Sequence, residues 1–199
     1  MRKLLAVATL AAALGFHGPA QAEGSVEAGR EKSAVCAACH GPDGNSAMPD
    51  WPSIAGQHTS YLVTQLKAFK SGERQNALMS PMAVGLSEQD ILDLAAYFNA
   101  QAPAAREADP ALVEPGRRIF LGGDLERGVT ACAACHGPTG QGNPLAGYPV
   151  IAGQHASYTA ATLKSYAAGE RQNQMMQEIA ARMSEDDIRA VSAFLQGLR

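Results

Sequence analysis

The sequence predicts an all-α protein that consists of two tandem domains of similar structure, and three observations support this prediction. Several short motifs recur at a separation of 96 or 97 residues, so most of the chain consists of two copies of one sequence unit. In each copy apolar residues recur with helical spacing, and no stretch of useful length alternates between apolar and polar residues. Glycine, proline, asparagine and aspartate gather between the expected helices, as in loops.

The composition excludes several classes of protein. The chain has 199 residues with a formal net charge of −3, and hydrophobic residues make up 46% of it, which excludes a disordered, highly charged tail protein. A mildly acidic balance without a block of Lys and Arg argues against a general nucleic-acid binder. Aromatic residues make up only 6%, which is few for two compact cores built from side chains alone.

The first 22 residues are expected to be a cleavable signal peptide. A basic start at Met1–Lys3 precedes a 13-residue apolar run, and Ala20–Ala22 forms an Ala-x-Ala cleavage signal. The apolar run is short for a membrane span, so an uncleaved anchor is the weaker alternative. Cleavage would leave residues 23–199, with a net charge of −5, in the periplasm or an equivalent compartment where disulfides can form.

The repeat defines the expected domain boundaries. Four segments recur: Cys36–Pro42 as Cys132–Pro138, Ile54–His58 as Ile151–His155, Gly72–Asn76 as Gly169–Asn173, and the Ser-Glu-x-Asp-Ile pattern of Ser87–Ile91 as Ser184–Ile188. A stretch rich in Ala and Pro at 101–110 separates the copies and is expected to be a linker. The expected organisation is a signal peptide at 1–22, an N-terminal domain at 23–103 and a C-terminal domain at 104–199.

Helices are expected at matching places in the two copies. Ser87 and Ser184 have the features of N-caps, because acidic residues and then an apolar face follow each of them. Gly72 and Gly169 are expected to end the preceding helices. The other expected helices span 27–35, 60–71, 114–121 and 157–168.

The cysteine motifs predict the cofactor. Cys-x-x-Cys-His is the attachment signal of c-type haem, in which two thiols add to the vinyl groups and the adjacent histidine binds the iron. We therefore expect two covalently bound haem c groups, with their attachment residues at Cys36, Cys39, Cys132 and Cys135 and axial ligands at His40 and His136. A zinc site with four cysteine ligands, two local disulfides or a thioredoxin-like redox pair are the alternatives, but none of them explains the histidine after each pair.

The repeat also predicts a second axial ligand for each iron. When every methionine is shifted by 97 residues, only Met79 falls on another methionine, Met176. If both copies bind haem alike, these two thioethers are the ligands, in stretches that we expect to be polar and poor in helix. Packing of these methionines in the core is the alternative role. The competing ligands are Met82, Met175 and, for bis-histidine coordination, His58 and His155.

Two further matched pairs are candidates for contacts around the haems. The carbonyls of Pro52 and Pro149 could accept the Nδ1 proton of the axial histidines. Arg74 and Arg171 could bind haem propionates through their guanidinium groups. Ordinary loop residues are the alternative in both cases.

The order of these motifs resembles the dihaem cytochrome c4 family across essentially all of residues 23–199. The resemblance implies two class I cytochrome c domains related by an approximate two-fold axis, and it assigns the axial ligands to His40, Met79, His136 and Met176. It implies an electron-transfer protein, not an enzyme, with no small-molecule substrate. Pro81, two residues after Met79, departs from the family pattern.

The same resemblance implies a place in a respiratory chain. A periplasmic carrier of this family would transfer single electrons from a donor such as a quinol-oxidising complex towards a terminal oxidase, with peripheral association at the membrane. The alternative is a cytochrome subunit of a dihaem or flavocytochrome oxidoreductase, of the peroxidase type or of the type that oxidises sulfur compounds.

Overall fold

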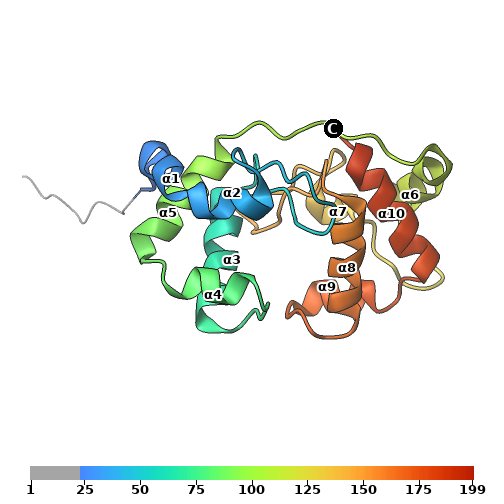
Figure 1. The fold of residues 1–199 in the computed structure, drawn as a ribbon. Coiled ribbons are helices and arrows are strands. Elements are labelled where there is room, and N and C mark those ends of the chain that lie inside the picture. Colours follow the sequence, from blue (N-terminus) through green and yellow to red (C-terminus); the bar gives the residue numbers. More distant parts are fainter. Residues whose placement is uncertain (1–22) are drawn as a thin grey trace, which may run out of the picture.

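The computed structural model describes residues 23–199, and the signal peptide expected at 1–22 lies outside the described residues. Two groups of helices lie side by side, joined by an extended segment that runs along one edge of the molecule (Figure 1). The N-terminal lobe contains α1 (Val26–Lys32), α2 (Ala34–His40), α3 (Thr59–Ser71), α4 (Met79–Val84) and α5 (Glu88–Asn99). The C-terminal lobe contains α6 (Pro110–Gly122), α7 (Ala133–His136), α8 (Ala156–Ala167), α9 (Gln174–Ala180) and α10 (Glu185–Gly197).

The predicted fold class is confirmed. Within residues 23–199 there is no β-strand, and two isolated bridges pair Asp124 with Val129 and Asn143 with Tyr148. None of the helices in this part of the chain combines the length and the apolar character that crossing a membrane requires.

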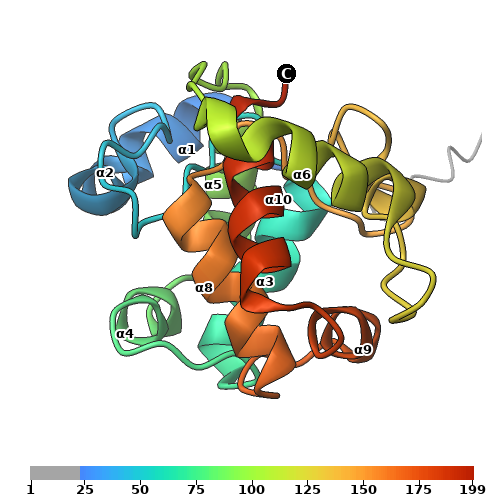
Figure 2. The same ribbon diagram turned by 90° about the vertical axis from the view of Figure 1, so that its right-hand side faces the viewer.

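Each lobe is organised around a close crossing of its first and last helices, α1 with α5 and α6 with α10 (Figure 2). A glycine makes each crossing possible: a Cβ atom on Gly29 would lie 2.0 Å from the carbonyl oxygen of Asp93, and one on Gly116 would lie 2.2 Å from that of Ala190. Behind the crossings lie small apolar clusters, one with Leu62, Leu94, Ala95, Tyr97 and Phe98, the other with Phe120, Val191 and Leu195.

The last helix of each lobe begins where the sequence predicts. The hydroxyl of Ser87 accepts the N–H of Asp90 at 3.1 Å, and the Asp90 carboxylate accepts the N–H of Ser87 at 2.9 Å. Ser184 and Asp187 form the same reciprocal pair at 3.1 and 2.8 Å. These capping boxes fix the first turns of α5 and α10 in the same way in both lobes.

The structure differs from the expected helices in two respects. The expected helix at 27–35 ends at Lys32. No helix was expected at the cysteine motifs, but α2 contains the whole of Cys36–His40, and α7 begins directly after Cys132 and ends at His136. The stretches around Met79 and Met176 are short helices, so the expectation that they are poor in helix is wrong. The side chains of Asn76 and Asn173 accept N–H groups at the starts of these helices. These bonds stabilise helices that are too short to be stable by themselves.

The segment between the lobes is extended, as expected of a linker, but it is not a free tether. Arg106 donates from one guanidinium nitrogen to the carbonyl oxygen of Gly153 at 2.7 Å. Its other terminal nitrogen donates to the carbonyl of Ser46 at 3.0 Å and to the hydroxyl of Ser53 at 2.8 Å. This side chain therefore joins the N-terminal lobe to the C-terminal lobe.

Candidate haem sites

A cavity of about 690 Å³ extends between and into the two lobes. All eight residues that the sequence predicts to bind the cofactors line this cavity: Cys36, Cys39, His40, Met79, Cys132, Cys135, His136 and Met176. The structure therefore brings together the residues of each predicted set, with one set on each lobe.

The two motif histidines occupy equivalent, buried positions at the ends of α2 and α7, and each is less than a tenth exposed. The Nδ1 atom of His40 lies 2.8 Å from the carbonyl oxygen of Pro52, and that of His136 lies 3.0 Å from that of Pro149. A carbonyl oxygen can only accept, so Nδ1 carries the proton and the Nε2 lone pair is free to bind a metal. Burial lowers the pKa of both histidines, which favours this neutral form.

The geometry argues against the zinc and disulfide alternatives. The four cysteines are free thiols, and the two pairs lie on different lobes. No group of three or more His, Cys, Asp or Glu side chains within residues 23–199 is arranged to hold a metal ion. Burial raises the pKa of the Cys132 thiol to about 11, which disfavours its thiolate form.

Met79 and Met176 lie at matching positions on the cavity wall, at or near the starts of α4 and α9, and both are half-buried. The side chain of Asn76 accepts the N–H of Met79 at 2.9 Å, and that of Asn173 accepts the N–H of Met176 at 3.0 Å. The sequence reasoning assigned no role to these asparagines, although an asparagine three residues before each methionine is a recognisable N-cap signal.

The competing methionines are in less suitable places. Met82 and Met175 also line the cavity but are about half exposed. Met183 packs against the apolar cluster of the C-terminal lobe. Among the methionines of residues 23–199, only Met79 and Met176 are both half-buried and matched in the repeat.

The repeated histidines face the opposite lobe, not the cavity. The Nε2 atom of His58 lies 2.7 Å from the carbonyl oxygen of Gln141, and that of His155 lies 2.9 Å from that of Ser46. Neither histidine lines the cavity. This geometry argues against the bis-histidine alternative, because both histidines lie outside the cavity and the Nε2 atom of each is engaged in a hydrogen bond between the lobes.

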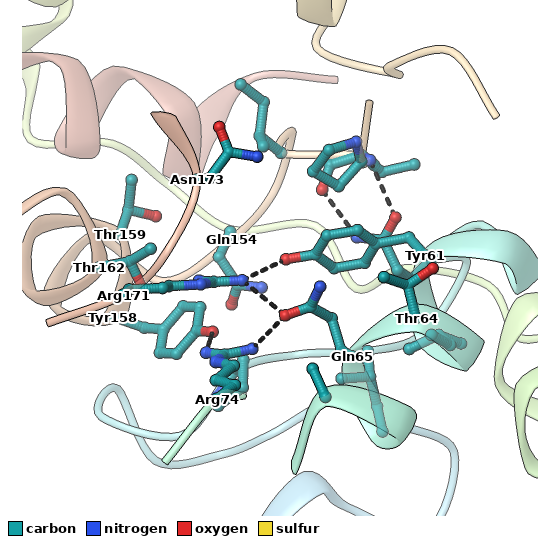
Figure 3. Close-up of a pocket in the computed structure, with 18 of the residues that line it drawn as sticks. Tyr61, Thr64, Gln65, Arg74, Gln154, Tyr158, Thr159, Thr162, Arg171 and Asn173 are labelled. Atoms are coloured by element: carbon teal, nitrogen blue, oxygen red, sulfur yellow. Dashed lines mark hydrogen bonds between the residues drawn. The ribbon is translucent and has the colours of Figure 1, made fainter. Parts of the chain in front are cut away.

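A polar cluster at the boundary between the lobes involves both predicted arginines (Figure 3). Arg74 donates to the hydroxyl of Tyr158 at 3.2 Å, and Arg171 donates to that of Tyr61 at 2.7 Å. Both guanidinium groups also donate to the side-chain oxygen of Gln65, at 2.7 and 2.9 Å. The alternative that these are ordinary solvated loop arginines is wrong for Arg171, which is 7% exposed.

No carboxylate in the described part of the chain balances the charge of this cluster. No Asp or Glu side chain in residues 23–199 forms an ion pair with Arg74 or Arg171. Arg171 is buried and Arg74 is half-buried, so an anion close to them would offset their mutual repulsion and the desolvation of Arg171. The haem propionates would supply such anions, so the arginines, the thiols, the histidines and the methionines together fit two haem c groups.

Comparisons with known proteins agree with this geometry. The family model for cytochrome c matches residues 26–101 and again residues 113–199. Cytochrome c4 of Azotobacter vinelandii is 45% identical over 97% of this chain and 98% of its own length. The crystal structure of reduced recombinant cytochrome c4 from Pseudomonas stutzeri matches with a TM-score of 0.85 and 45% identity, over 88% of this chain and all of that one.

A further relative has a more specific name. A protein of Thiomonas intermedia called thiosulfate dehydrogenase electron acceptor is 37% identical over 98% of this chain and 90% of its own length. The two matched cytochrome c regions, each with one attachment motif, account for the two predicted cofactors. The chain therefore belongs to the cytochrome c4 family, as an electron-transfer protein with two covalently bound haem c groups.

Proposed function

We propose that this protein is a periplasmic carrier of single electrons with two six-coordinate haems, in an N-terminal domain at 23–103 and a C-terminal domain at 104–199. His40 and Met79 are the axial ligands of the first haem, and His136 and Met176 are those of the second. The observation that carries the proposal is that each lobe presents one buried histidine and one half-buried methionine to the same cavity. Two protein ligands leave the iron no open position for a substrate.

The bound haem supplies one-electron chemistry between Fe(III) and Fe(II), and the residues around it hold the ligands in place. The carbonyls of Pro52 and Pro149 keep the proton on Nδ1 of each histidine, which leaves the Nε2 lone pair free and would hold the ring in place for the iron. A methionine sulfur is a softer ligand than imidazole, so it favours Fe(II) and raises the potential.

The arginine pair is assigned to the propionates. Arg74 and Arg171 lie at the boundary between the lobes without a carboxylate partner in the described chain, and the tyrosines opposite orient their guanidinium groups. Propionates held here would bring the two haems towards each other, which shortens the path for an electron between them.

The ligand assignment is tested by substitution of Met79. Ferric haem with methionine as a ligand has a far-red charge-transfer band, and Met79→Ala should remove the contribution of one haem and lower the potential of the first haem only. Met82→Leu is the matched control, because Met82 is a neighbouring methionine on the same cavity wall, and it should leave the band and both potentials in place. An unchanged first potential in Met79→Ala would remove Met79 from the site, and high-spin ferric haem at neutral pH or rapid cyanide binding by the unsubstituted protein would contradict the closed carrier.

The proposed donor is a quinol-oxidising complex and the proposed acceptor a terminal oxidase, with peripheral contact at the membrane surface. Export by the signal peptide at 1–22 would place the carrier in the periplasm. Stopped-flow mixing with membranes that contain both complexes should reduce the haems on addition of quinol and oxidise them on addition of oxygen. If neither rate exceeds that of free haem peptide, the respiratory assignment is wrong.

A second candidate function is that of electron acceptor for an oxidoreductase that oxidises sulfur compounds. The observation that favours it is the similarity, over 98% of this chain, to the relative named thiosulfate dehydrogenase electron acceptor. Reduction by such a dehydrogenase with thiosulfate, measured beside reduction by a quinol-oxidising complex, separates the two. Whichever donor reduces the haems faster at equal concentration identifies the function.

A further inference from the structure

The two lobes exchange a matched pair of glutamine contacts. The side-chain oxygen of Gln57 accepts the N–H of Val150 at 2.9 Å, and its side-chain nitrogen donates to the carbonyl of Val150 at 2.8 Å. Gln154 forms the same two bonds with Ser53, at 2.9 and 2.8 Å. The glutamines are 97 residues apart, and so are their partners, so the repeat relates the two contacts.

Each glutamine contacts the peptide group that also holds a predicted haem ligand. The carbonyl of Pro52 and the N–H of Ser53 belong to one peptide group. Its oxygen accepts the Nδ1 proton of His40, while its N–H donates to Gln154 of the other lobe. In the mirrored chain of bonds, the peptide between Pro149 and Val150 joins His136 to Gln57.

The orientation of each carboxamide is determined by its surroundings. The oxygen of Gln57 also accepts the N–H of His58 at 3.0 Å, and the oxygen of Gln154 accepts the N–H of His155 at 3.0 Å. A flipped amide would direct its NH2 group at two backbone N–H donors. The oxygen of each glutamine must therefore face these two N–H groups. Gln57 is 8% exposed and Gln154 is half-buried, so water does not compete freely for the bonds of Gln57.

We propose that Gln154 and Gln57 are positioning residues, each of which tunes the potential of the haem bound to the opposite lobe. A peptide group whose N–H donates to a strong acceptor is more polarised, and its carbonyl becomes a stronger acceptor. A stronger bond from Nδ1–H makes the histidine a more basic ligand, which stabilises Fe(III) and lowers the potential. The proposal rests on the proposed function, in which His40 and His136 bind the two irons.

The test is a crossed pattern of potentials in the holoprotein. Gln154→Leu removes the acceptor and should shift the potential of the first haem, attached at Cys36 and Cys39, upwards by more than that of the second. Gln57→Leu should do the reverse. The potentials are measured by spectroelectrochemical titration, and each is assigned to its haem from hyperfine-shifted NMR signals.

Two serines supply controls that also span the lobes. Ser60 donates to the carbonyl of Pro144 at 3.2 Å, and Ser157 donates to the carboxylate of Asp50, but neither touches the peptides that hold the histidines. Ser60→Ala and Ser157→Ala should leave both potentials unchanged. If they shift the potentials as the glutamine variants do, the effect belongs to docking of the lobes, and the proposal is wrong.

The outcomes separate this proposal from the function on which it rests. Haem content and the far-red methionine band are read in the same samples, so an absent haem or an absent band contradicts the proposed ligation itself. With both intact, equal shifts of the two potentials, no shift, or a shift only of the haem on the substituted lobe overturns the proposal. Gln154→Met retains the length of the side chain without the amide, and it carries the same prediction if Gln154→Leu does not fold.

Discussion

The two lobes are alike where they face the cavity and differ where their terminal helices cross. In the N-terminal lobe, Asp93 is buried at the crossing and accepts bonds from Lys32 at 2.6 Å, from the N–H of Ser25 at 2.8 Å and from Gln89 at 2.8 Å. The equivalent residue of the C-terminal lobe is Ala190, with no polar group to satisfy. The same backbone crossing is therefore stabilised by a polar network in one lobe and by apolar packing in the other.

In each lobe a basic side chain pairs with the aspartate of the capping box, but the two basic residues come from different elements of the structure. Lys32 of α1 contacts the carboxylate of Asp90 at 2.7 Å. In the C-terminal lobe the equivalent Asp187 pairs with Arg127, which comes from a loop that the first copy lacks and which also pairs with Asp124 at 2.6 Å. A carboxylate at a helix start can therefore retain its role while the residue that balances its charge changes.

The largest effect is expected at Gly29 and Gly116, the one feature that the two helix crossings share. Gly29→Ala and Gly116→Ala each force a Cβ atom against backbone and should lower the free energy of unfolding by about 3 kcal/mol or more. Gly85→Ala and Gly122→Ala are the matched controls, since an added Cβ meets nothing within 4 Å there and neither residue needs a positive φ. Denaturant unfolding, followed by circular dichroism and haem absorbance, measures the stability of all four variants. An unchanged unfolding midpoint in Gly29→Ala or Gly116→Ala would show that the two helices can move apart without loss of stability.

An intermediate effect is expected where the lobes differ. Asp93→Ala leaves an N–H and an amide without their acceptor and should cost about 1–3 kcal/mol of stability. Ala190→Asp should be at least as damaging, because Ile119 stands in place of Lys32 and cannot donate to the new carboxylate. Adding Ile119→Lys to Ala190→Asp should recover part of the lost stability. If it does not, the polar network of the N-terminal lobe cannot be reproduced at the crossing of α6 and α10.

The pH dependence of this effect has a definite sign. Chiefly through the hydrogen bond from Lys32, the pKa of Asp93 falls from 3.8 to about 2 in the folded protein. Stability from a lowered carboxylate pKa is present above the unfolded value and is lost as pH falls through the folded value. The difference in stability between the unsubstituted protein and Asp93→Asn should therefore narrow between pH 4 and pH 2, and a constant difference would contradict the charge assignment.

The smallest effect is expected at the loop that only the C-terminal lobe has. Arg127 is 39% exposed, so solvent and salt screen its pairs with Asp124 and Asp187. Arg127→Ala should lower the melting temperature slightly at low salt and not measurably at high salt. Lys32→Ala should lower it more and at both salt concentrations, because it leaves the buried carboxylate of Asp93 unpaired. Equal decreases in melting temperature in the two variants would contradict the expectation that the ion pairs of Lys32 contribute more to stability than those of Arg127.

Local signals in the sequence determined much of this molecule. The Cys-x-x-Cys-His motifs and the serine caps at Ser87 and Ser184 depend on residues within a few positions of one another, and the repeat is visible by comparing the chain with itself. Together they predicted the fold class and the cofactor. The offset of 97 also selected Met79 and Met176 from among the methionines, without reference to any contact.

Only the tertiary structure decided what lies between the lobes. His58 and His155 were candidate ligands in the sequence, but they bond to carbonyls 83 and 109 residues away. Gln57 and Gln154 are matched in the repeat, but the sequence assigns them no role. The structure shows that each bonds to a peptide group of the other copy. The physical reason is that a hydrogen bond between distant residues depends on how two surfaces dock, whereas a cap or an attachment motif is complete within one turn of the chain.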